Sequence, residues 1–140
     1  MVQFPPLDPA YRSWSKAMWR GARGKCPSCG RGQIFSSFTK VRENCEVCGL
    51  ELHHQRADDA PPYFTIFIVG HLVVPLVFIV ERTWQPPYWV HAALWLPLIL
   101  ALTFFLMPVV KGAIVGLQWA LRMHGFGIEL DRDKSTERAP

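Results

Sequence analysis

Two long apolar segments dominate the pattern of hydrophobic and polar positions along the chain. Residues 63–80 contain no acid, lysine or arginine over 18 positions, and residues 89–110 contain none over 22. As helices, these segments would be roughly 27 and 33 Å long, close to the ~30 Å hydrocarbon core of a bilayer. A loop of eight residues, 81–88, separates them. The pattern predicts a membrane α fold, a two-span transmembrane helical hairpin.

The segments outside the two spans predict shorter elements. Residues 1–23 place basic side chains on one helical face and aromatic side chains opposite, as in an amphipathic helix on a membrane surface. A loose, positively charged flank is the alternative. Residues 53–62 form a polar linker whose two consecutive prolines should end local structure before the first span. Residues 111–124 predict an interfacial helix, and residues 125–140 predict a polar tail.

Small residues recur at every fourth position of the predicted interfacial helix, at Gly112, Gly116 and Ala120. Such a row lets two helix backbones approach closely, so it predicts contact with another helix. The alternative is that the glycines are incidental to packing.

The distribution of charge predicts which ends of the chain face the cytoplasm. The chain carries 15 Lys and Arg against 11 Asp and Glu, a net charge of +4. Nine basic residues precede the first span, one lies between the spans, and five follow the second. Because basic loops stay in the cytoplasm, we expect both termini there, in a multi-pass protein of the bacterial inner membrane. A soluble protein with two buried helices is the alternative, but these segments have no polar face for water.

All four cysteines lie within residues 24–52 at a regular spacing. Two CxxC pairs, each followed by glycine, are separated by fifteen residues and consist of Cys26, Cys29, Cys45 and Cys48. This spacing predicts a zinc ribbon in which two tight turns present four thiolates to one ion. Gly30 and Gly49 can adopt the positive φ of such turns. Four thiolates complete a tetrahedral site and leave no position for substrate, so the predicted Zn²⁺ is structural.

Other uses of the cysteines stay open on the sequence alone. Iron suits the same four ligands, a redox-active site would need only one CxxC pair, and disulfides are disfavoured in a reducing cytoplasm.

Phe35, Phe38 and Val41 favour a hairpin between the two turns. His53 and His54 follow the second turn closely, but four cysteines already suffice as ligands.

Five ionisable residues lie in or near the predicted spans, at Asp58, Asp59, His71, Glu81 and His91. His71 lies near the middle of the first span, where it is either functional or a neutral imidazole hydrogen-bonded to the second span. We expect His91 to contact Glu81 across the hairpin mouth. The two histidines differ in depth by ~10 Å, which argues against one haem between them. Asp58 and Asp59 would cap the first span.

The order of these motifs resembles a known bacterial family over roughly residues 20–120. The resemblance rests on the two cysteine pairs followed by Asp58-Asp59-Ala60-Pro61-Pro62-Tyr63-Phe64, Gly70-His71, Trp89-x-His91, Leu94-Trp95-x-Pro97 and Pro108-x-x-Lys111-Gly112. The chain is similar to the family catalogued as domain of unknown function 983, small membrane proteins with zinc-ribbon turns and two spans. Because genes of that family often lie in oxidase clusters of alphaproteobacteria, the resemblance implies a link to cytochrome c oxidase or its assembly factors.

Three functions follow as expectations. The favoured one is a non-enzymatic accessory or assembly protein whose ribbon docks a larger inner-membrane complex. The second is handling of a metal or haem through His71 and His91. The third is a membrane-tethered ribbon that binds nucleic acid through basic residues between Arg12 and Arg42, which we expect least. No acid, base and nucleophile come together, so neither an enzyme nor a small-molecule substrate is expected.

Overall fold

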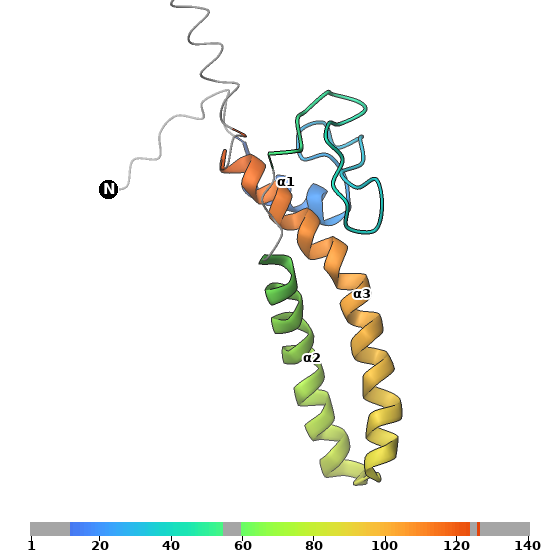
Figure 1. The fold of residues 1–140 in the computed structure, drawn as a ribbon. Helices are drawn as coiled ribbons and strands as arrows, with labels where there is room; N and C mark the ends of the chain where they lie inside the picture. Colours follow the sequence, from blue (N-terminus) through green and yellow to red (C-terminus); the bar gives the residue numbers. More distant parts are fainter. Residues whose placement is uncertain (1–11, 55–59, 124–125, 127–140) are drawn as a thin grey trace, which may run out of the picture.

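Three helices form the framework of the computed structural model, which describes residues 12–54, 60–123 and 126. In chain order these are α1 (Trp14–Ala22), α2 (Ala60–Trp84) and α3 (Tyr88–Ala120). Figure 1 shows α2 and α3 side by side as a hairpin, with α1 and the cysteine-containing segment at the end opposite the connecting loop. The part of the chain that the structure describes has no strands, only isolated antiparallel bridges. The predicted fold class is confirmed.

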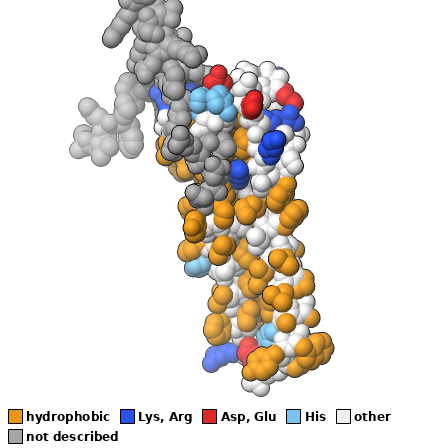
Figure 2. All heavy atoms as spheres, in the orientation of Figure 1, with side chains coloured by type: hydrophobic (Ala, Val, Ile, Leu, Met, Phe, Trp, Pro, Cys, Tyr) orange, Lys and Arg blue, Asp and Glu red, His pale blue; other side chains and the backbone are white. Residues whose placement is uncertain are grey.

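The two long helices are apolar and long enough to cross a membrane, with 25 residues in α2 and 33 in α3. Most of their large hydrophobic side chains, such as Phe67, Phe78 and Phe105, are exposed rather than buried inside the protein. Figure 2 shows that the visible face of the hairpin is mainly hydrophobic and that charged side chains gather toward its two ends. This distribution is that of helices surrounded by lipid, because only an apolar solvent tolerates so much exposed hydrocarbon.

The hairpin is held together by a small apolar seam. Val69 and Val73 of α2 are buried against Trp95 of α3, and neighbouring aliphatic side chains cover this cluster. The seam occupies one narrow stripe on each helix, and most of the other large hydrophobic side chains of the hairpin stay exposed.

The first spanning helix begins earlier than the sequence predicts. Pro61 and Pro62 lie in the first turn of α2, so the predicted linker boundary at residue 62 is wrong. A proline in the first turn loses no helical hydrogen bond, and its fixed φ suits a helix. The buried Thr65 hydroxyl donates a hydrogen bond to the Pro61 carbonyl at 2.7 Å. At its other end α2 extends to Trp84, beyond the predicted end at residue 80.

The second spanning helix is also longer than predicted. α3 continues through residue 111 without a break, so the predicted interfacial segment is the last part of the same helix. Lysine favours helix, and one glycine in a helix costs only about 1 kcal/mol, so Lys111 and Gly112 do not stop it. Figure 1 shows that the axis of α3 changes direction in its orange part. Pro97 and Pro108 lie inside the helix and lack the N–H that would hold it straight.

α1 packs against the last part of α3 through small residues on both helices. A methyl group at Gly112 would lie 1.9 Å from the carbonyl oxygen of Gly21, and one at Gly116 would lie 2.3 Å from that of Ala17. The two backbones therefore touch, and no side chain fits between them. Ala120, the third residue of the row, ends α3 and is half-buried. The structure thus assigns α1 as the helix that this row contacts.

α1 covers only part of the predicted basic segment, since residues 1–11 lie outside the described residues. Its buried positions are Ala17 and Gly21, while Trp14 and Trp19 are exposed. The Arg23 guanidinium lies over the Trp19 ring, 4.6 Å from its centroid. A position on the membrane surface stays a prediction for this helix.

Candidate metal centre

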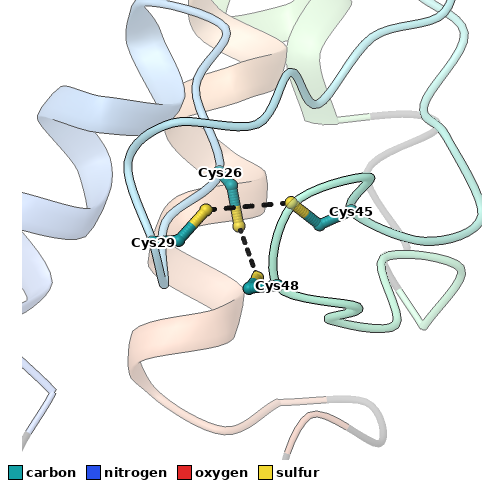
Figure 3. A group of neighbouring side chains, drawn as sticks. All are labelled: Cys26, Cys29, Cys45 and Cys48. Atoms are coloured by element: carbon teal, nitrogen blue, oxygen red, sulfur yellow. Dashed lines mark hydrogen bonds between the residues drawn. The ribbon is translucent and has the colours of Figure 1, made fainter.

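The four cysteines meet at one point next to α3, two from each turn (Figure 3). The sulfur atoms of Cys26 and Cys48 are 3.7 Å apart, those of Cys29 and Cys45 are 3.8 Å apart, and all four lie within 4.8 Å of one another. These separations are far longer than the ~2.0 Å of a disulfide bond. Zinc bound to sulfur at about 2.3 Å in a tetrahedron would place the sulfurs about 3.8 Å apart. The cluster therefore fits a tetrahedral metal ion.

Each cysteine pair is presented by the same kind of turn. The amide of Gly30 donates to the carbonyl of Cys26 at 2.9 Å, and the amide of Gly49 donates to that of Cys45 at 3.0 Å. Gly30 and Gly49 have φ of 69° and 74°, a left-handed conformation that costs a side-chain-bearing residue energy. The predicted positive φ is confirmed at both positions. Equivalent turns facing each other bring four thiols to one centre.

Gly32 is a third glycine that the centre requires, and the sequence analysis did not identify it. A methyl group at this buried position would lie 2.3 Å from the sulfur of Cys45. The Gly32 amide donates to the sulfur of Cys29 at 3.5 Å, while its carbonyl accepts from the Cys26 amide at 2.8 Å. Gly32 therefore lets the backbone approach the sulfurs directly.

The thiols of Cys26, Cys29 and Cys48 have pKa values shifted in different directions. Hydrogen-bond donation from the Gly32 amide lowers the pKa of Cys29 to about 6, so its sulfur is a thiolate at neutral pH. Burial raises the pKa of Cys26 above its ordinary value, and burial also raises the pKa of Cys48. Because a metal takes up thiolates, its binding must displace protons from Cys26 and Cys48.

Arg20 of α1 fixes the first turn from outside, a role that the sequence analysis also missed. Its guanidinium donates to the carbonyl of Ser28 at 3.0 Å and to that of Pro27 at 3.3 Å. The same side chain covers Gly30, whose added methyl group would lie 3.0 Å from it. Charged donors make stronger hydrogen bonds than neutral ones, so this contact couples α1 to the metal centre.

The segment between the two turns anchors the module to α3. Phe35 and Val41 form an isolated antiparallel bridge rather than the strands of a regular hairpin. Ile34 is fully buried against Val115 of α3. Phe38 stacks on Phe104 of α3, with ring centroids 4.2 Å apart. The module is thus packed on the helix rather than merely tethered to it.

Of the two alternatives for His71, the hydrogen bond to the second span is not the one that its contact within α2 supports. Its Nδ1 lies 2.8 Å from the Phe67 carbonyl one turn earlier in α2, and its ring lies against the Phe67 ring. The side chain is exposed and lines a shallow hollow of about 440 Å³ at Gly70 and Pro75. The sequence left both alternatives open because α2 is apolar on all sides and does not indicate which face meets α3.

His91 and Glu81 meet at the hairpin mouth. The Nε2 of His91 lies 2.8 Å from a carboxylate oxygen of Glu81, and the indole N–H of Trp95 donates to its Nδ1 at 3.0 Å. Since Nδ1 accepts, the ring is neutral with its proton on Nε2, donated to Glu81. Both ring nitrogens are therefore engaged and unavailable to a metal.

The remaining candidates lie apart from the cysteines. His53 and His54 do not join the four sulfurs, and they gather with Glu51 instead. Asp58 and Asp59 lie outside the described residues, so their capping of α2 stays a prediction.

A comparison with protein-family models finds a match, and the matched region covers most of this fold. The family described as protein of unknown function (DUF983) matches residues 35–119. The chain belongs to this family. Searches of curated proteins and of solved structures found no match.

The DUF983 match has a clear relation to the fold. It contains Cys45, Cys48, all of α2, α3 except its last residue, and the α3 glycines that contact α1. It begins at Phe35, after Cys26 and Cys29, so the first cysteine pair precedes the matched region. The evidence for that pair as half of the metal centre is its geometry.

Proposed function

We propose that this protein is a non-enzymatic accessory or assembly protein of the bacterial inner membrane. The two spanning helices would pack beside a larger membrane complex, and a zinc-bound ribbon on the cytoplasmic side would dock to that complex. The closed set of four cysteines supports a structural metal, because a tetrahedral ion with four thiolates has no open position for a substrate. Zinc suits this ligand set and the reducing cytoplasm.

The observation that carries this proposal is the outward-facing imidazole of His71. Ionisable side chains at the depth of the hydrocarbon core almost always face a bundle interior or a water-filled cavity. His71 instead points away from α3 and is exposed in the isolated chain. Its Nδ1 donates to the Phe67 carbonyl, which leaves the lone pair of Nε2 directed away from that bond. A hydrogen-bond donor on a partner helix would satisfy this nitrogen.

The hollow around His71 supports the proposal that this face of α2 is the one that contacts the partner. It is lined by Ile66, Phe67, Gly70, His71, Val74 and Pro75. Gly70 has open space where a side chain would be, so a neighbouring backbone could approach there. Close approach at small residues combined with an interhelical hydrogen bond is how helices associate in a membrane.

The second cysteine turn is the docking surface that the ribbon offers. The first turn is covered by Arg20, whereas residues 46–49 are all exposed. Val47 at this turn is 56% exposed, an apolar side chain at the tip of a polar loop. Interfaces bury such apolar side chains at their centre, within a polar rim.

Two other functions receive less support. Haem or metal handling through both histidines requires free ring nitrogens, and those of His91 are engaged by Glu81 and Trp95. Nucleic-acid binding requires basic side chains directed outward. Arg12 and Arg20 instead donate hydrogen bonds to backbone carbonyls of the protein itself.

Site-specific photo-crosslinking in native membranes tests the proposal. A photoreactive residue at Val74, on the hollow, should give a crosslink to one membrane protein, which mass spectrometry identifies. The same residue at Leu76, about 140° away from His71 at ~100° per residue, is the matched control and should crosslink mainly to lipid. Recovery of cytochrome c oxidase subunits or assembly factors would identify the complex that the family resemblance implies.

Substitutions complete the test. His71→Leu should abolish the Val74 crosslink, and Val47→Asp should weaken recovery of the same partner while zinc content stays at the wild-type value. Ser37→Asp, at another exposed position of the ribbon, should have no effect. If no membrane protein crosslinks at Val74, or if His71→Leu leaves that crosslink unchanged, the proposed docking is refuted.

A further inference from the structure

A second group of metal-ligating side chains lies beyond the cysteine centre. The side chains of Glu51, His53 and His54 bring one carboxylate oxygen and two imidazole nitrogens within 4.8 Å of one another. The Nε2 of His54 is 2.8 Å from a carboxylate oxygen of Glu51. The rings of His53 and His54 have centroids 4.0 Å apart. His53 and His54 lie in a turn that follows the bridged residue Glu51, and this turn brings the two adjacent rings together.

The backbone around these three residues is held in place. Glu51 forms an antiparallel bridge with Asn44, next to the second cysteine turn. The amides of Leu52 and His53 both donate to the Glu43 carbonyl, at 2.7 and 3.1 Å. The side chain of Leu52 is fully buried against the cysteine cluster. The group is therefore attached to the most constrained part of the ribbon, although its own side chains face outward.

We propose that Glu51, His53 and His54 form a second metal site, which binds a divalent transition-metal ion such as Zn²⁺. Two imidazoles and one carboxylate are a common ligand set for this ion, at about 2.0–2.2 Å from each ligand atom. A tetrahedral ion at those distances would hold the ligand atoms about 3.4 Å apart. The three ligand atoms now lie within 4.8 Å of one another, so no pair has to approach by more than about 1.4 Å to reach that spacing.

The proposed site differs in kind from the cysteine centre. Three ligands leave the fourth position of a tetrahedral ion open to water, whereas four cysteines close it. Glu51 and His53 are exposed, and His54 is half-buried with its ring edge toward Phe126. An ion here can therefore exchange with solvent while the ion in the cysteine centre stays in place. The protein would carry one permanent metal and one exchangeable metal on the same ribbon.

The competing explanation is an ion pair between His54 and Glu51, three residues apart. This pair needs no contribution from His53. The two explanations therefore differ in what His53 does.

Zinc titration of the full chain in detergent decides between them. The protein is first prepared with one Zn²⁺ per chain, and free Zn²⁺ is then varied against a chromophoric competitor. Wild type should bind a second equivalent. His53→Ala and His54→Ala should each weaken that second equivalent by more than about tenfold, because loss of even an outer partner of a ligand costs 10- to 100-fold. Ser37→Ala, at an exposed ribbon position outside this group, is the matched control and should bind the second equivalent as wild type does.

Retention of the first zinc in each variant shows that the ribbon has remained folded. Co²⁺ bound as the second metal should give only weak visible absorption, without the intense bands of thiolate ligands. If wild type stops at one zinc, or if His53→Ala binds the second equivalent as tightly as wild type, the proposed site is refuted. This readout does not depend on a partner protein, so it can fail or succeed independently of the docking proposal.

Discussion

The close contact between α1 and α3 makes a quantitative prediction for Gly112→Ala. An added methyl group would lie 1.9 Å from the carbonyl oxygen of Gly21 and 3.4 Å from the Phe35 ring. A carbon and an oxygen in ordinary contact need about 3.2 Å or more, so α1 would have to move by about 1.3 Å. The obstacle is backbone in a packed helix, which cannot rotate away as a side chain can.

Two opposing terms set the size of the effect. Alanine is a better helix former than glycine by about 1 kcal/mol, which stabilises α3. Overpacking a close contact costs typically about 1–3 kcal/mol, and a rigid obstacle favours the upper end. We therefore expect a net loss of about 2 kcal/mol in the stability of the α1–α3 contact. Gly70→Ala is the matched control, because a methyl group there meets nothing within 4 Å. It should stabilise the hairpin by about 1 kcal/mol and leave the α1–α3 contact unchanged.

Limited trypsin digestion in mild detergent measures this contact. Cleavage after Lys16 requires α1 to detach and unfold locally, so its rate reports the free energy of opening. A loss of 2 kcal/mol should raise that rate about thirtyfold for Gly112→Ala, whereas Gly70→Ala should leave it unchanged, since Gly70 does not contact α1. Thermal unfolding of the hairpin reports the gain at Gly70. Equal cleavage rates for wild type and Gly112→Ala would refute the close backbone contact.

Three further predictions concern the cysteine centre. Gly32→Ala should displace the sulfur of Cys45 and reduce zinc binding by at least an order of magnitude, measured by competition with a chromophoric chelator. Arg20→Met should speed zinc release to a chelator by about fivefold, because the lost hydrogen bonds are worth about 1 kcal/mol at a partly exposed site, while Arg31→Met should not. Removing the metal completely should make residues 24–52 sensitive to trypsin, and re-adding Zn²⁺ should restore protection.

The sequence was sufficient to predict the two spanning helices and the four cysteine ligands. Uncharged runs of membrane length leave few alternatives to spanning helices, and two CxxC pairs with following glycines define a pair of metal-binding turns. Gly112 and Gly116 also indicated a close helix contact. The sequence did not indicate the partner of that contact, because Ala17 and Gly21 are inconspicuous among the basic and aromatic residues of α1.

Side-chain direction was the main feature that the sequence could not supply. The orientation of His71 depends on which face of α2 meets α3, and that face is chosen by the packing of similar aliphatic side chains around Val69 and Val73. The role of Gly32 depends on how near the first turn comes to Cys45, a distance between residues thirteen positions apart. Neither property leaves a periodic signal in the chain.

Val41 is one residue through which the metal centre and the membrane hairpin are connected. Val41 packs both against the cluster of Cys26, Cys45 and Leu52 and against the cluster of Ile34 and Val115. A small module cannot bury enough apolar surface to stay folded without its metal. Loss of the ion would therefore release Val41, and with it the contact that seats the ribbon on α3. Metal occupancy thus determines whether the exposed second turn is held at a fixed position relative to the membrane, which is what a docking surface requires.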